Sequence, residues 1–195
     1  MHRSFVVTAI LGLGLVIATK RPALSQDASA RNVLASFCDL DSQGAQVAPG
    51  GWEKVVGLFA TPGTPRRDLI MVVRDYAVSQ GSEKGRSAAG DRMVGFHVVY
   101  TVLGLIDPSE ARFDPNPPGL KVEPSLFVVR QARRASGGSS RLGESAEWRI
   151  EGSVPEPHLS VDASIRYTAQ LRESATDETV RRNADRALAA LKRLR

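Results

Sequence analysis

Residues 93–105, MVGFHVVYTVLGL, form a long run in which β-branched and aromatic residues predominate. A run of this composition and length predicts a β-strand. Residues 69–78, LIMVVRDYAV, have the same character, and the polar residues 80–91 separate the two runs. We therefore expect the two strands to pair as an antiparallel ribbon at the centre of a sheet.

Both faces of this ribbon are largely apolar. In the second run, Val94, Phe96 and Val98 alternate with Val99 and Leu103 on the opposite face. A half-exposed antiparallel sheet has polar residues on its outer face. The pattern therefore predicts that both faces are covered, one by N-terminal helices and the other by C-terminal helices or by a second copy in a homodimer.

Further elements follow from periodicity on either side of the ribbon. Apolar residues at helical spacing predict helices over 28–41 and 52–59, and short β-rich runs predict strands that extend the sheet. The expected strands cover residues 68–79, 92–106, 124–131 and 147–152, with a glycine- and serine-rich hairpin loop at 132–145. The fold class is therefore α+β, with N-terminal helices packed on a curved antiparallel sheet of about four strands.

The last forty residues predict a helical hairpin. Residues 159–172 fit both strand and helix periodicity, and helix is favoured because Ser160 can serve as N-cap and Asp162 lies in the first turn. Val180, Ala184 and Leu188 begin the apolar stripe of a final helix. We expect three units, namely residues 1–25, an α+β domain at 26–155 and the C-terminal helical hairpin at 156–195.

The N-terminus is typical of a secretory signal peptide. His2 and Arg3 precede an apolar run over residues 5–18, and Ala23 and Ser25 are the small residues of a cleavage site. The apolar run is shorter than the roughly 20 residues that a membrane-spanning helix needs. We expect an exported protein, periplasmic or extracellular after cleavage, and membrane-anchored if the signal is not cleaved.

Charge and cysteine content narrow the class of protein. The chain of 195 residues has a formal net charge of +5, and removing residues 1–25, which hold three basic residues and no acid, leaves +2. Cys38 is the one cysteine, so no internal disulfide can form and a packed core must supply stability. We expect Cys38 itself to be a small buried hydrophobic residue.

The C-terminus is basic. Residues 181–195 contain one acidic residue, Asp185, and six basic residues: Arg181, Arg182, Arg186, Lys192, Arg193 and Arg195. Such a helix could contact an anionic membrane, although a solvated helix face explains the same residues. Nucleic acid is not an expected partner, because the chain is exported and no aromatic residues alternate with the arginines.

His97 is the foremost candidate for chemistry. It interrupts an apolar strand, and an imidazole can act as acid or base near neutral pH. Tyr76 and Arg74 on the paired strand are weaker catalytic candidates, and a hydrogen-bonded structural role explains His97 equally simply. His158 lies between a proline and a helix start, which does not suggest a ligand.

No cofactor or metal site is expected from the sequence. Asp39 and Asp41 open a calcium-like loop, with Gly44 at the sixth position, but Gly50 stands where a bidentate glutamate is needed. A helix end followed by a turn explains these residues. The chain also lacks a nucleophile elbow, a phosphate-binding glycine loop and paired cysteines.

The order of elements over residues 28–152 resembles the nuclear transport factor 2-like superfamily, which has a cystatin-like cone fold. In both, N-terminal helices precede long antiparallel strands. The resemblance implies a pocket and no particular activity, because the superfamily contains small isomerases, dehydratases and cyclases beside non-catalytic domains. The C-terminal helical pair departs from the usual domain.

Three hypotheses of function result. The first is an exported, non-catalytic binding or accessory protein that holds a small apolar ligand or a protein partner. The second is a cone-fold enzyme of the isomerase or dehydratase type that uses His97 in proton transfer on a small apolar substrate. The third is an interaction module that docks through its basic C-terminal helix.

Overall fold

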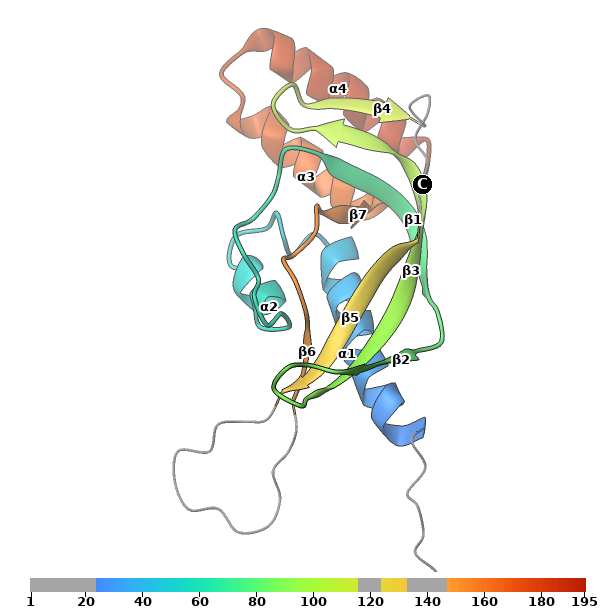
Figure 1. Ribbon diagram of the computed structural model, residues 1–195. Helices are drawn as coiled ribbons and strands as arrows, with labels where there is room; N and C mark the ends of the chain where they lie inside the picture. Colours follow the sequence, from blue (N-terminus) through green and yellow to red (C-terminus); the bar gives the residue numbers. More distant parts are fainter. Residues whose placement is uncertain (1–23, 116–123, 133–146) are drawn as a thin grey trace, which may run out of the picture.

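The computed structural model describes residues 24–115, 124–132 and 147–195. The long strand predicted from the sequence lies at the centre of the fold. This strand, β3 (Arg92–Asp107), runs the full length of a curled sheet (Figure 1). β1 (Ile70–Val78) and β2 (Ser82–Arg86) pair with one edge of β3. The predicted antiparallel ribbon of β1 and β3 is therefore present.

The other strands complete a mixed sheet of seven strands. The opposite edge of β3 pairs with β4 (Arg112–Pro115) and β5 (Ser125–Ala132), and β6 (Glu147–Ile150) follows β5. β7 (His158–Ser160) lies parallel to β1 on its outer edge. The expectation of about four antiparallel strands is corrected here, because β2, β4 and β7 are short and lack the apolar runs that identify a strand.

Helices of unequal length precede the sheet. α1 (Leu24–Ser42) packs a stripe of buried side chains on the sheet, whereas α2 (Trp52–Val56) has only five residues. The predicted helix over 52–59 ends early because Gly57 follows it and the backbone at Phe59 forms a parallel bridge with Ile150. None of the helices in the described ranges is long and apolar enough to cross a membrane.

The C-terminal hairpin consists of α3 (Val161–Ser174) and α4 (Glu178–Lys192). The Ser160 hydroxyl accepts a hydrogen bond from the backbone N–H of Ala163, so the predicted N-cap is confirmed. The Asp177 carboxylate caps α4 in the same way. Helix was thus the correct choice for most of residues 159–172, and strand holds only for the residues of β7.

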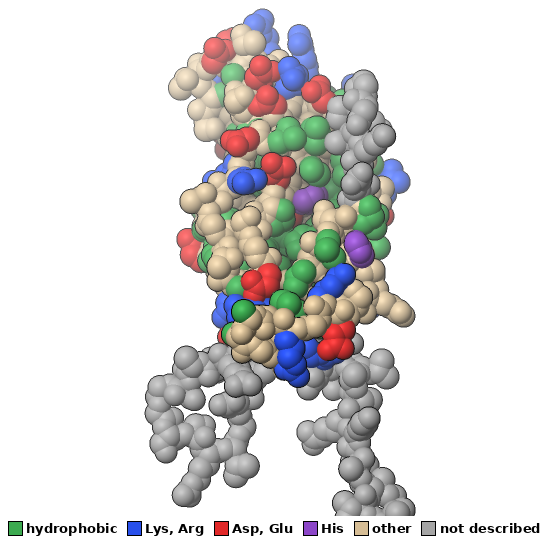
Figure 2. Space-filling model, viewed as in Figure 1, with side chains coloured by type: hydrophobic (Ala, Val, Ile, Leu, Met, Phe, Trp, Pro, Cys, Tyr) green, Lys and Arg blue, Asp and Glu red, His purple; other side chains and the backbone are tan. Residues whose placement is uncertain are grey.

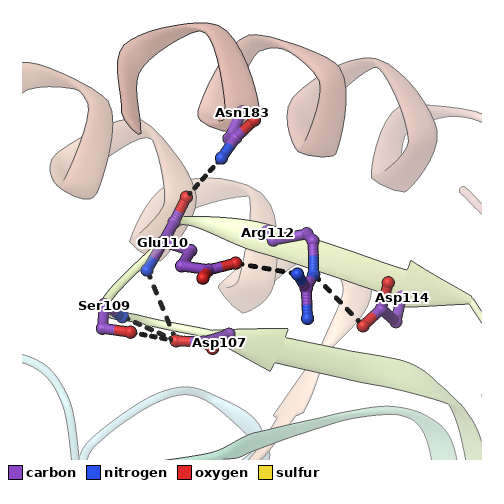
Figure 3. A network of polar contacts seen from close by, with 6 residues as sticks. All are labelled: Asp107, Ser109, Glu110, Arg112, Asp114 and Asn183. Atoms are coloured by element: carbon purple, nitrogen blue, oxygen red, sulfur yellow. Dashed lines mark hydrogen bonds and ion pairs between the residues drawn. The ribbon is translucent and has the colours of Figure 1, made fainter. Parts of the chain in front are cut away.

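The hairpin is fastened to the sheet at the turn between β3 and β4 (Figure 3). Asn183 of α4 donates a hydrogen bond to the backbone carbonyl of Glu110, and Arg112 pairs with the carboxylates of Glu110 and Asp114. Asp107 accepts hydrogen bonds from Ser109, which lower the pKa of its carboxyl group. Polar contacts therefore order this turn against the helix.

Two hydrophobic clusters divide the interior. The first lies between α1 and one half of the sheet, and the second lies between the hairpin and the other half (Figure 1). β1 and β3 contribute to both clusters, because Val73 and Val98 belong to the first and Ile70 and Ile106 to the second. The two long strands thus connect the two clusters.

One face of the sheet is open beside the first cluster, contrary to the expectation that both faces are covered. Val94, Phe96 and Val98 are buried, but Val99 on the opposite face is 45% exposed. The hairpin covers the second face only near the other end of the sheet, where it packs on Ile106. The predicted signal peptide and the predicted loop at 132–145 lie almost wholly outside the described residues.

Candidate functional site

The three sequence-predicted site residues do not meet in one pocket. His97 is exposed, and its imidazole has no hydrogen-bonding or charged partner among the described residues. Tyr76 points to α1, where its hydroxyl donates a hydrogen bond of 2.6 Å to Asp39. Arg74 is exposed on β1, and none of the described residues forms an ion pair with it.

The structure instead joins Asp41 and His158, which lie far apart in the sequence. Asp41 is the last buried residue on the inner face of α1, and β7 begins at His158. One carboxyl oxygen of Asp41 accepts a hydrogen bond of 3.2 Å from the backbone N–H of His158, and the same oxygen shares a hydrogen bond of 3.2 Å with Nδ1 of the imidazole. The other accepts a bond of 2.7 Å from the Gln46 amide. This pair therefore ties α1 to the edge strand β7.

Tyr100 and Cys38 extend the pair into the first hydrophobic cluster. The Tyr100 ring stacks on the His158 imidazole, with 3.9 Å between centroids and 13° between planes. The Cys38 sulfur lies 3.6 Å from the Tyr100 hydroxyl. We call Cys38, Asp41, Tyr100 and His158 the buried polar cluster.

Burial governs the protonation of this cluster. Desolvation raises the pKa of the Asp41 carboxyl group. The hydrogen bonds with His158 lower this pKa, but the effect of desolvation is larger. Burial likewise raises the pKa of Cys38 to about 12 and raises the pKa of Tyr100. A thiol of this kind is not a nucleophile at neutral pH.

The cluster has one group suited to proton transfer. Nδ1 of His158 is held by Asp41, and its Nε2 has no hydrogen-bond partner in the described part of the chain. A carboxylate that orients an imidazole in this way is the usual support of a general base. A substrate has little access to this imidazole, however, because His158 is only 6% exposed.

Sequence reasoning missed this cluster, although α1 carried a signal for it. The buried stripe on α1 consists of Ala30, Leu34, Phe37 and Cys38, and Asp41 follows at the next helical interval. A carboxylate on the buried stripe of a helix needs a buried partner. The sequence does not reveal which residue that partner is, because it lies 117 positions away.

The geometry of residues 39–44 does not support their interpretation as a calcium-binding loop. Asp39 is bound to Tyr76, and Asp41 is turned inward to His158. Among the residues that the structure describes, no group of three or more His, Cys, Asp or Glu side chains is placed to hold a metal ion.

The open face of the sheet is the second distinctive surface. Leu126 on β5 is 52% exposed and lies opposite His97, and Val99 lies opposite Ala77 of β1. We call Ala77, His97, Val99 and Leu126 the open face. In the view of Figure 2, hydrophobic side chains reach the surface across the middle of the molecule.

The C-terminal cations are partly neutralised. Arg181 pairs with Glu178, and Arg195 pairs with Asp162 at the start of α3. Arg186, Lys192 and Arg193 are exposed without an acidic partner in the described residues. Two of the six predicted cations are therefore paired with an acid, whereas Arg182, like Arg186, Lys192 and Arg193, has no acidic partner in the described part of the chain.

No family model matches the chain, and no curated protein or solved structure shows significant similarity to it. The resemblance to the nuclear transport factor 2-like superfamily thus stays a prediction from the order of elements.

Proposed function

We propose that this is an exported, non-catalytic binding protein that contacts another protein through the open face of its sheet. The observation that carries the proposal is the exposure of Val99 and Leu126 on neighbouring strands, at 45% and 52%. The two side chains lie diagonally on one face of β3 and β5, and contiguous exposed apolar side chains are typical of interaction surfaces. Export rests on the N-terminal leader of the sequence.

The arrangement of polar groups agrees with binding rather than catalysis. Within the described ranges, no second polar group is placed to orient the imidazole of the exposed His97. The oriented His158 is nearly sealed in the core. A catalytic base needs both orientation and access to its substrate.

Site-specific photo-crosslinking tests the proposal. The photoreactive residue benzoylphenylalanine replaces Leu126 or, as a matched control, Leu194, which is 38% exposed at the C-terminus. A discrete crosslinked product from Leu126 and none from Leu194 is expected, and its mass distinguishes a second copy from a different protein. A product from Leu194 alone would favour docking through the C-terminal helix instead. The absence of any product from Leu126 would refute a contact at the open face.

A second candidate is a proton-transfer enzyme of the cone-fold type, with His158 in place of His97. The observation in its favour is the hydrogen bond between His158 Nδ1 and Asp41, which leaves Nε2 without a partner among the described residues. NMR of the two imidazoles, assigned with His97→Gln and His158→Gln, tests it against a panel of small apolar ligands. Ligand-induced shifts at His158 alone would support this enzyme, and unchanged His158 signals would rule it out.

A further inference from the structure

The outer edge of β1 is paired along only part of its length. β7 pairs with Met71, Val72 and Val73, and within the described ranges no strand lies beside residues 74–78 on that side. An unpaired strand edge presents backbone N–H and C=O groups to any extended segment that can reach it.

The register fixes which backbone groups face this edge. Ser79 donates its N–H to the carbonyl of His97 on β3, so the residues that bond inward are Ser79 and Ala77. The backbone groups of Val78 and Tyr76 therefore face outward. The Val78 carbonyl does point outward, because it accepts a hydrogen bond of 3.0 Å from the Arg31 guanidinium of α1.

A groove of about 470 Å³ runs between this edge and α1. It is lined by Arg31, Asn32, Ala35, Tyr76, Ala77 and Val78. Arg31 is the one charged residue that the described part of the chain contributes to this lining, and it uses one donor on Val78. The carboxylates of Asp39 and Asp75 lie outside this lining, where they accept hydrogen bonds from the hydroxyls of Tyr76 and Thr101.

We infer that the outer edge of β1 at residues 76–78 binds an extended acidic peptide, which adds to the sheet as a further strand beside β1. The ligand backbone pairs with the outward groups of Tyr76 and Val78, and this is the usual basis of affinity in strand addition. It replaces Arg31 on the Val78 carbonyl. The released guanidinium then binds a carboxylate of the ligand.

The charges at this edge argue against a second copy of β1 as the strand that binds there. An antiparallel pairing of two copies would bring both Arg31 guanidinium groups, each held on its own Val78 carbonyl, to the one shared edge. Like charges placed opposite each other are destabilising. An acidic strand from another polypeptide has no such conflict.

Fluorescence anisotropy with a labelled, acetylated octapeptide of alternating threonine and glutamate tests the inference. Val78→Pro removes an outward N–H and no sheet bond, so it is expected to fold and to weaken binding about tenfold or more. Arg31→Gln is expected to weaken binding about fivefold to tenfold. Arg182→Gln on α4 is the charge-matched control, and it should bind as the wild type does.

Amide hydrogen exchange locates the binding site. In the free protein the amides of Tyr76 and Val78 should exchange quickly and that of Ala77 slowly, and the peptide should slow the first two. Wild-type affinity in Val78→Pro, or no binding at about 1 mM peptide, would overturn the inference. Leu126→Asp should leave peptide binding unchanged, so this site and the open face are tested separately.

Discussion

Burial changes what the Cys38 thiol can do. With its pKa raised from 9.0 to about 12, the thiolate fraction at pH 8 falls by a factor of about 1000. We expect iodoacetamide to label native Cys38 about 1000-fold more slowly than the urea-unfolded chain, as followed by mass spectrometry. Equal rates would mean that α1 exposes the thiol in solution.

Asp41 should make the stability of the fold depend on pH. Because burial raises its pKa above 3.8, the folded state holds the proton more tightly than the unfolded state. The resulting stabilisation is full below about pH 3.8 and is lost as the pH rises through the folded pKa. Asp41→Asn, which does not titrate, should therefore be less stable than the wild type by about 1–3 kcal/mol near pH 4.

Urea unfolding of the wild type and of Asp41→Asn at several pH values shows whether their difference in stability grows or shrinks with pH. The deficit of Asp41→Asn should shrink towards pH 7. A deficit that grows with pH would show instead that Asp41 is charged and paired with a protonated His158 in the folded state.

The residue scale also shows where sequence reasoning stops. The alternation of β3 correctly separated His97 from Val98 and Phe96, but it could not show that the His97 face is open. The sequence neighbours of His158, a proline and a helix start, give no sign of its role. Its role depends on Asp41, which only the folded chain brings near.

At the scale of the elements, the junction of β3 and β4 leaves no room for a side chain at Gly104. A Cβ added at Gly104 would lie 2.5 Å from the backbone oxygen of Asp114 and 2.6 Å from the Phe113 ring. Neither neighbour can move without disturbing the strand pair or the second cluster. Gly104→Ala is therefore expected to lower the free energy of unfolding by about 1–3 kcal/mol.

Gly95→Ala is the matched control on the same strand. Its added Cβ would meet the Lys84 side chain, from Cγ to Cε, and this exposed side chain can turn away by changing its rotamer. Urea unfolding should give a much smaller loss for Gly95→Ala than for Gly104→Ala. Equal losses would show that the β4 contact is looser in solution.

The elements differ in how far their sequences predicted them. β1 and β3 have long apolar runs, and α3 has a capping serine, so their type and approximate bounds were predictable. β2, with the sequence SEKGR, is fully exposed and has no such signal. β7 has three residues, and it is a strand only because β1 lies beside it.

At the scale of the whole molecule, β1 and β3 pass through both hydrophobic clusters, and this should make unfolding a single cooperative transition. Both tryptophans report on the first cluster, since Trp148 belongs to it and Trp52 packs against it. Leu191 is fully buried in the second cluster, on α4. A cavity there should cost about 2–5 kcal/mol.

Leu191→Ala is therefore expected to shift the urea midpoint seen by tryptophan fluorescence, although the substitution lies outside the cluster that holds both tryptophans. Leu34→Ala, inside the first cluster, should shift the same transition and serves as the positive control. If the clusters unfolded independently, Leu191→Ala would leave the fluorescence midpoint unchanged, and only hydrogen exchange in α3 and α4 would accelerate. A joint shift would establish that β1 and β3 transmit the loss of one cluster to the other, because the strands are the elements common to both.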